Sequence, residues 1–194
     1  MAQDSSKADF WESRYRDNVI PWDAGKVPTS LQEYARKLSP GIRVLIPGCG
    51  SAYEAAHLAG QGIDVLAIDF SPAAVEAARK NLAGFEHVLR FADFFDFDYG
   101  KPYDVIYERA FLCALPRRIW PQYAPRTAQI LRPGGELAGF FFLRETERGP
   151  PFGMTLASLH VLLDPHFALI EDKAVTDSIP VFQGAERWQV WRRR

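Results

Sequence analysis

Short apolar runs alternate with helix-like segments through the middle of the chain. The apolar runs cover residues 43–46, 65–68, 88–92, 104–107 and 136–143. Helices are predicted for the segments 51–60, the stretch that begins at Ser71 and Pro72, and 117–131, which Pro121 and Pro125 are expected to break or kink. Strands without polar alternation are typical of a parallel sheet that helices cover on both faces.

The two ends of the chain depart from this alternation. Residues 8–17 and 29–38 predict two short helices ahead of the first strand. Residues 167–170 and 188–191 predict two strands connected only by a loop, which favours an antiparallel pair at the sheet edge. We therefore predict an α/β fold, a doubly wound and mostly parallel sheet with a C-terminal antiparallel strand.

Length and composition indicate one globular domain that spans residues 1–194. Hydrophobic residues make up 47% of the chain and charged residues 24%, which is typical of globular domains. The net charge is −1 and the isoelectric point is about 6.4, so the chain lacks the basic surface that nucleic-acid binding needs. The closing Arg192–Arg194 run is expected to be a solvated tail. Because no dimerisation segment is recognisable, we expect a monomer.

Nothing in the sequence indicates a membrane segment, a disulfide framework or a metal site. Cys49 and Cys113 form no paired motif. The start of the chain, Met1–Lys7, is polar, and no stretch approaches the ~18 uninterrupted apolar residues of a membrane helix. No cluster of histidine, cysteine or carboxylate side chains has metal-ligand spacing. We expect a cytoplasmic protein with reduced thiols and no metal.

A glycine turn follows the first predicted strand and opens a helix. It reads Ile46-Pro47-Gly48-Cys49-Gly50-Ser51. Two glycines let a backbone approach a ligand closely, and the N-terminus of a helix offers unpaired N–H groups. Dinucleotide enzymes place a third glycine three residues after the second, whereas this chain has Tyr53 there. The motif is incomplete, and a purely structural turn is the alternative interpretation.

Carboxylates follow the next two predicted strands. Asp69 ends the second strand, and a carboxylate at that distance from a glycine turn is placed to accept the hydroxyls of a ribose. Asp93 ends the third strand and is followed by Phe94, a pair suited to the amine and the ring face of adenine. Open α/β sheets bind ligands at the carboxyl ends of their strands. The three strand ends together therefore predict a nucleoside site.

A further run, Leu131-Arg132-Pro133-Gly134-Gly135, precedes the fifth strand. Together with this run, and in this order, the motifs resemble those of the S-adenosylmethionine-dependent methyltransferase superfamily. More narrowly, the chain resembles the thiopurine S-methyltransferase family and the related plant thiol and halide methyltransferases. Three features carry this narrower resemblance: Trp11 with Tyr15 and Pro21-Trp22-Asp23; Tyr107-Glu108-Arg109-Ala110 with Ala114-Leu115; and Gly149-Pro150-Pro151-Phe152. The resemblance covers residues 10 to 191.

The resemblance implies a seven-stranded Rossmann-like sheet and an N-terminal helical cap, residues 1–40, that folds over the donor S-adenosylmethionine. The product is then S-adenosylhomocysteine. With the residues above, it predicts these donor contacts: Trp11, Trp22, Pro47, Gly48, Gly50, Asp69, Phe70, Asp93, Phe94 and Glu108. A sulfonium cation is attracted to an aromatic face, which suits the tryptophans. The predicted acceptor contacts are Tyr15, Arg109, Pro151 and Phe152, and the predicted catalytic side chains are Glu108 and Arg109.

Two features favour different acceptors. In the halide branch a tyrosine stands where this chain has Arg109, which favours the thiopurine branch. The run Phe111-Leu112-Cys113-Ala114 instead resembles the halide and thiol branch. We expect a small-molecule thiol or thiopurine-like sulfur acceptor, because in-line displacement by a soft thiolate needs alignment and water exclusion more than a strong base.

Two alternatives stay open at this stage. The same fold can methylate a halide, thiocyanate or a hydroxyl acceptor. A nicotinamide-dependent oxidoreductase or a non-catalytic nucleoside-binding protein is the other alternative. The missing third glycine and the antiparallel end of the chain argue against it.

Overall fold

The computed structural model describes residues 4–194, so residues 1–3 of the predicted N-terminal cap lie outside the described residues. The strands are β1 (Arg43–Pro47), β2 (Asp64–Asp69), β3 (Leu89–Phe91), β4 (Tyr103–Arg109), β5 (Leu131–Phe142), β6 (Phe167–Ala174) and β7 (Glu186–Arg193). Their order is β3-β2-β1-β4-β5-β7-β6, which confirms the predicted seven-stranded sheet. The chain forms two compact units that divide between Asp98 and Tyr99. The single domain predicted for residues 1–194 stays a prediction.

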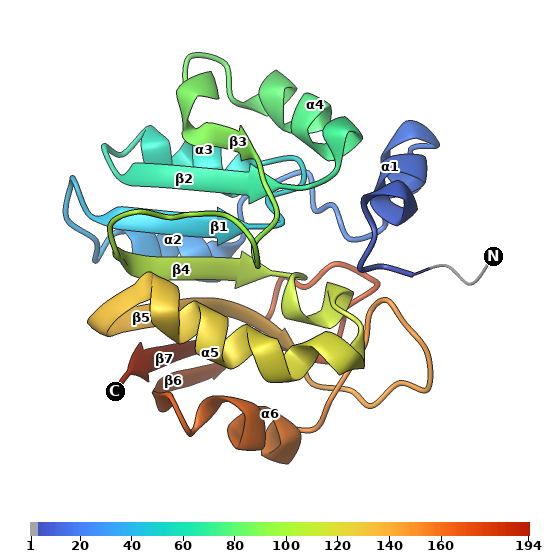
Figure 1. The fold of residues 1–194 in the computed structure, drawn as a ribbon, viewed down its shortest axis with the longest axis vertical. Coiled ribbons are helices and arrows are strands. Elements are labelled where there is room, and N and C mark those ends of the chain that lie inside the picture. The colour runs from blue at the N-terminus through green and yellow to red at the C-terminus, as the bar shows by residue number, and fades with distance from the viewer. Residues whose placement is uncertain (1–3) are drawn as a thin grey trace. The chain divides into compact units, whose positions relative to one another are not determined.

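The first unit carries three parallel strands and four helices. The helices are α1 (Ala8–Arg16), α2 (Thr29–Ala35), α3 (Tyr53–Ala59) and α4 (Pro72–Asn81), with a 3-10 turn η1 (Glu86–Val88). In the parallel register Pro47 of β1 lies beside Ile68 of β2, so both carboxyl ends reach the same edge. Ser71 caps α4 as predicted and accepts a hydrogen bond from Ala74 N. Figure 1 shows α1 beside the start of α4.

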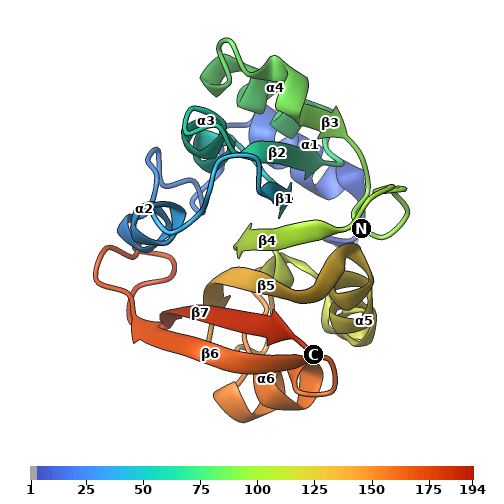
Figure 2. The same ribbon diagram turned by 90° about the vertical axis from the view of Figure 1, so that its left-hand side faces the viewer.

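The second unit carries the remaining strands, with helices α5 (Trp120–Ile130) and α6 (Leu156–Leu163) and the 3-10 turns η2 (Leu112–Ala114) and η3 (Arg117–Ile119). Strand β4 pairs in parallel with β5, whereas β7 is antiparallel to both of its neighbours, β5 and β6. Figure 2 shows β7 between these two strands. The predicted antiparallel C-terminal pair is confirmed, and within the second unit β7 runs against β4, β5 and β6.

Helices of the second unit differ in part from the sequence prediction. Helix α5 continues past Pro125, while Pro121 lies in its first turn, where a missing N–H costs nothing. Helix α6 was not predicted. Its signals were the cap Thr155, whose side chain accepts from Ser158 N, and apolar positions at 156, 159 and 163.

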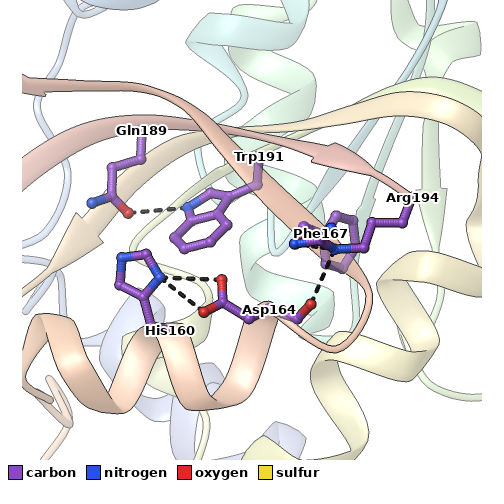
Figure 3. A network of polar contacts seen from close by, with 6 residues as sticks. All are labelled: His160, Asp164, Phe167, Gln189, Trp191 and Arg194. Atoms are coloured by element: carbon purple, nitrogen blue, oxygen red, sulfur yellow. Dashed lines mark hydrogen bonds and ion pairs between the residues drawn. The ribbon is translucent and has the colours of Figure 1, made fainter.

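The C-terminal arginines form bonds within the second unit, so the predicted solvated tail is wrong in that the run is no free tail, while Arg192 and Arg194 are exposed as predicted. Arg194 Nε donates to Phe167 O at 3.0 Å and to Asp164 O at 3.2 Å. Arg192 pairs with Glu136 at 2.9 Å. Figure 3 shows Arg194 beside α6, where His160 contacts Asp164 and its ring lies against Trp191. The run is held because β7 extends to Arg193 and brings these side chains to backbone carbonyl groups.

Candidate active site

Left-handed backbone builds the glycine turn between β1 and α3. Gly48, Gly50 and Ala52 have φ angles of 57°, 51° and 57°. A Cβ added to Gly50 would lie 2.6 Å from Tyr15 Oη, a separation that real Cβ contacts do not show. Position 50 therefore favours glycine for two reasons: the backbone is left-handed, and a side chain would collide with Tyr15.

Asp69 ends β2 as a buried carboxylate that is 8% exposed. Its Oδ2 accepts a hydrogen bond from Gly50 N at 3.1 Å, and its Oδ1 accepts one from Ser71 N at 3.0 Å. Burial raises the pKa of this carboxyl to about 6, and the backbone donors offset part of the rise. A carboxylate has about four lone-pair sites. Asp69 therefore has capacity for further donors such as ribose hydroxyls.

An aromatic cluster of Trp11, Tyr15 and Trp22 lies against the glycine turn. The rings of Trp11 and Trp22 meet edge to face with centroids 5.2 Å apart, and Trp22 Nε1 donates to Tyr15 Oη at 3.5 Å. Burial, and next the nearby Asp69 charge, raise the pKa of the Tyr15 hydroxyl. The structure thus links residues of α1 and the following turn to Asp69 and Gly50. Tyr15, predicted at the acceptor, lies with the predicted donor contacts.

Glu12 of α1 forms hydrogen bonds with residues at the start of α4. Its Oε2 accepts hydrogen bonds from Ala73 N at 2.7 Å and from the Ser71 hydroxyl at 3.1 Å. A carboxylate at a helix N-terminus satisfies free N–H groups and complements the helix dipole. The hydrogen bond from Ala73 N is the main reason that the pKa of Glu12 is lowered. The same contact holds Trp11 and Tyr15 near the end of β2.

Asp93 and Phe94 follow β3 and belong to the first unit. Asp93 Oδ1 accepts a hydrogen bond from Phe95 N at 2.8 Å, which shapes the turn. Phe94 is 4% exposed and meets Phe95 edge to face at 5.1 Å. The adenine contact predicted for the pair stays a prediction, and the structure adds this local role in the turn.

Glu108, in the second unit, has a buried carboxylate near the end of β4. It is 1% exposed, and its Oε2 accepts hydrogen bonds from Phe111 N at 3.0 Å and Leu112 N at 3.1 Å. Burial raises its pKa to about 7, although these two donors lower it in part. Glu108 also lines a small pocket in the second unit with Cys113, Phe152 and six other residues: Leu112, Phe140, Phe141, Phe142, Leu143 and Met154.

Arg109 lies on the other face of the sheet from Glu108, because consecutive strand residues alternate. Its side chain is 8% exposed, and Nε lies 3.6 Å from Glu186 Oε1, whose side chain is 2% exposed. The guanidinium carbon is 5.1 Å from the centre of the Phe140 ring. The two predicted catalytic side chains therefore have separate surroundings, and their roles stay predictions.

The loop after β5 brings Phe152 to the pocket. Phe152 N donates to Cys113 O at 2.6 Å. Arg117 donates to Gly153 O at 3.2 Å and to Thr146, and its guanidinium carbon lies 5.6 Å from the centre of the Phe152 ring. Pro151 O accepts a bond from Thr146 Oγ1 at 3.2 Å. The predicted acceptor wall is thus a loop fixed by hydrogen bonds.

Three contributors to these sites were missed from the sequence. Glu12 bonds to residues 59 and 61 positions away, and the Ser51 hydroxyl donates to Asp23 across 28 positions. Glu186 is buried only because β7 packs beside β5. The pattern of α1 offered one local signal, the Glu12–Arg16 spacing of an ion pair. The other contacts had none.

Within residues 4–194, no helix is long and apolar enough to cross a membrane. The same residues contain no group of three or more histidine, cysteine or acidic side chains that is arranged to hold a metal ion.

The strand order and the glycine turn followed by a buried carboxylate define a Rossmann-like nucleoside-binding protein. Solved structures show the same fold. The 1,6-didemethyltoxoflavin-N1-methyltransferase of Burkholderia thailandensis, crystallised with S-adenosylhomocysteine, superposes with a TM-score of 0.74 at 18% identity. The match covers 96% of this chain and 86% of that one.

The chain belongs to the thiopurine S-methyltransferase family, whose family model matches residues 6–194. Among relatives, probable thiol methyltransferase 2 of Arabidopsis thaliana is 30% identical over 171 residues, which cover 85% of this chain and 75% of the relative. Thiocyanate methyltransferase 1 of Brassica oleracea is 25% identical over 190 residues, which cover 94% and 84%. The chain is therefore an S-adenosylmethionine-dependent methyltransferase, which excludes the oxidoreductase alternative.

The residues of the first unit fit this donor chemically. The buried Asp69 carboxylate offers acceptors for ribose hydroxyls, the glycine turn has no Cβ at position 50, and the aromatic cluster offers ring faces to a sulfonium. The fit rests on the chemistry of these groups.

Proposed function

We propose that this enzyme methylates the sulfur of a small-molecule thiol or thiopurine-like acceptor by in-line displacement. The buried Arg109 guanidinium carries this proposal. It lies on an apolar face beside Phe140 and forms an ion pair with Glu186, with 3.6 Å between Nε and Oε1. A guanidinium carries five N–H donors, so a buried Arg109 that pairs with Glu186 is suited to bind an anionic thiolate as well.

We assign the donor contacts to the predicted residues: Trp11, Trp22, Pro47, Gly48, Gly50, Asp69, Phe70, Asp93, Phe94 and Glu108. The contacts of Asp69 with Gly50 N and the packing of Tyr15 on the same glycine support the ribose end of this assignment. The proposed acceptor contacts are Arg109, Pro151 and Phe152. Tyr15 is the fourth, and it lies beside the residues that we assign to the donor.

When bound, the donor supplies a methyl carbon attached to a sulfonium sulfur, which is a good leaving group for an attacking acceptor. Arg109 then stabilises the negative charge of a thiolate and holds it in one place. The Phe140 ring beside the guanidinium keeps water away from it, which strengthens that electrostatic interaction. Alignment of the two reactants supplies the larger part of the rate gain, so no side chain has to remove a proton at the moment of transfer.

A second acceptor class is supported by one comparison. The chain is similar to a thiocyanate methyltransferase along 94% of its length, and the run from Phe111 to Ala114 resembles that branch. Thiocyanate or halide is therefore the competing acceptor. Both acceptor classes keep the fold, the family and the donor.

An acceptor panel separates these classes. Release of S-adenosylhomocysteine is measured with aromatic thiols, thiopurines, hydrosulfide, iodide, thiocyanate and phenols. We expect turnover on sulfur acceptors and a large loss of it in Arg109→Met, with donor affinity measured by calorimetry unchanged. Turnover on iodide or phenols in place of thiols contradicts the proposed acceptor.

A further inference from the structure

Asp23 brings a second carboxylate to the glycine turn of the first unit. It follows Trp22 in the segment after α1, and its Oδ2 accepts a hydrogen bond from the Ser51 hydroxyl. Its Oδ1 accepts one from Gly25 N at 2.8 Å. The Asn81 side chain holds the same part of the turn, because its Nδ2 donates to Ser51 O at 2.8 Å. The Asp23 carboxylate is therefore fixed beside the backbone that connects β1 to α3.

This carboxylate pairs with no cation of the protein. Both of its hydrogen bonds come from neutral donors, a backbone N–H and a hydroxyl. No lysine or arginine among residues 4–194 forms an ion pair with Asp23. A carboxylate has about four lone-pair sites, so two contacts leave capacity for further donors. Asp23 is half-buried, and part of its surface therefore stays open to a ligand.

The carboxylates of Asp23 and Asp69 contact neighbouring residues of the glycine turn. Asp69 Oδ2 accepts from Gly50 N at 3.1 Å, one residue before Ser51. Both carboxylates also lie near the Tyr15 hydroxyl. Burial is the main reason that the pKa of this hydroxyl is raised, and the charges of Asp69 and, more weakly, Asp23 add to the rise. Two negative groups at one turn favour a ligand part that carries a positive charge.

The strand order indicates which part of the donor reaches this turn. With the donor contacts proposed above, adenine lies at the end of β3 and the ribose at the end of β2. Strand β1 lies on the other side of β2 from β3, and neighbouring strands are about 4.8 Å apart. The amino-acid part, which follows the ribose and the sulfur, then lies at the end of β1. It carries an α-ammonium group, a cation with three N–H donors.

We propose that Asp23 binds the α-ammonium group of S-adenosylmethionine, and that Ser51 and Asn81 hold this carboxylate and the turn in place. The inference rests on the proposed donor contacts and adds Asp23 to them. A hydrogen bond between an ammonium group and a carboxylate is stronger than one between neutral groups. The product S-adenosylhomocysteine keeps the ammonium group and loses only the sulfonium charge, so Asp23 contributes to the affinity for both.

Two ligands that differ only in the amine test this contact. S-adenosylhomocysteine carries the ammonium group, whereas 5′-S-(3-carboxypropyl)-5′-thioadenosine keeps the nucleoside, the sulfur and the carboxylate but has hydrogen in its place. Calorimetry measures the affinity of wild type and of Asp23→Asn for each ligand. We expect Asp23→Asn to lower the affinity for S-adenosylhomocysteine about tenfold, the value of one hydrogen bond to a charged group, and to leave that for the analogue unchanged.

The change to asparagine keeps the local hydrogen bonds. Its amide oxygen accepts from Gly25 N, and the Ser51 hydroxyl, which also accepts, pairs with the amide nitrogen. Ser51→Ala is the second variant, since it removes the hydroxyl that holds Asp23 but leaves the charge. We expect a smaller loss, about threefold, and again only with S-adenosylhomocysteine. The matched control is Asp17→Asn, which removes the same charge at an exposed position of the same unit and is expected to bind both ligands as wild type does.

The outcomes separate this contact from the donor site as a whole. A loss confined to S-adenosylhomocysteine supports Asp23 as the partner of the ammonium group. If wild type binds both ligands equally, or if Asp23→Asn weakens both by the same factor or neither, the proposed role of Asp23 is wrong. In that case a loss of affinity for both ligands in Asp69→Ala leaves the other donor contacts standing. Unchanged affinity in Asp69→Ala as well would mean that the proposed donor contacts are wrong.

Discussion

At the scale of single residues, Asp69 is the side chain on which the donor proposal depends most. Asp69→Ala removes acceptors for ribose hydroxyls, so affinity for S-adenosylhomocysteine is expected to fall at least tenfold, about 1.4 kcal/mol or more. Calorimetry measures this affinity. Asp64→Ala, at the exposed start of the same strand, is the control and is expected to bind normally. Unchanged affinity in Asp69→Ala would remove Asp69 from the site.

Glu108 gives a second residue-scale prediction, through pH. Burial raises the pKa of its carboxyl from 4.5 to about 7, so the folded state favours the protonated form. This stabilisation is complete below pH 4.5 and is lost as pH rises through 7. Glu108→Gln keeps an oxygen that accepts from Phe111 N and Leu112 N. Because glutamine does not titrate, the variant lacks this pH-dependent contribution to stability.

The measurement is the free energy of unfolding by denaturant at pH 5 and pH 8, for wild type and Glu108→Gln. The wild-type decrease between these values is expected to exceed that of the variant by on the order of 2–3 kcal/mol. Asp69, with a pKa raised to about 6, contributes in the same direction in both proteins and cancels. Equal decreases in the two proteins would show that Glu108 does not titrate in this way.

At the scale of elements, the contact between α1 and α4 fixes the position of α1, which we propose covers the bound donor. Glu12→Ala removes the acceptor of Ala73 N and of the Ser71 hydroxyl, a capping contribution of about 1 kcal/mol. We expect affinity for S-adenosylhomocysteine to fall about fivefold and trypsin cleavage after Arg14 and Arg16 to become faster.

The control for this element is Asp9→Ala. Asp9 is an exposed acidic residue of the same helix. Asp9→Ala therefore removes the same charge as Glu12→Ala but leaves the contact between Glu12 and α4 in place. Cleavage and affinity in this variant are expected to equal those of wild type. Equal cleavage of Glu12→Ala and Asp9→Ala would mean that Glu12 does not hold α1.

At the scale of the whole molecule, we predict that residues 1–194 unfold as one domain although two compact units are distinguishable. A chain of 194 residues lies within the size of one domain. A variant with Trp11→Phe and Trp22→Phe reports fluorescence from the second unit alone, because Trp120, Trp188 and Trp191 remain. Its denaturation midpoint is expected to coincide with that from far-ultraviolet circular dichroism. Two separate midpoints would indicate two domains.

The sequence by itself determined the fold class and the order of the elements. Continuous apolar runs such as 65–68, short and alternating with helix-like segments, favour strands buried on both faces, and the glycine turn marks the boundary between strand and helix. The same local logic located Asp69 and the antiparallel C-terminal pair. Family motifs added the methyltransferase class, which the family match confirmed.

Only the tertiary structure decided which side chains meet. Glu12 contacts Ala73, which lies 61 positions further along the chain. Glu186 of β7 lies beside Arg109 of β4 because both strands pair with β5, one on each side. Alternation placed Glu108 and Arg109 on opposite faces, although they are neighbours in sequence. Such contacts depend on strand register and burial, which no local pattern of residues encodes, so neither the Glu12 contacts nor the Arg109–Glu186 pair followed from the sequence.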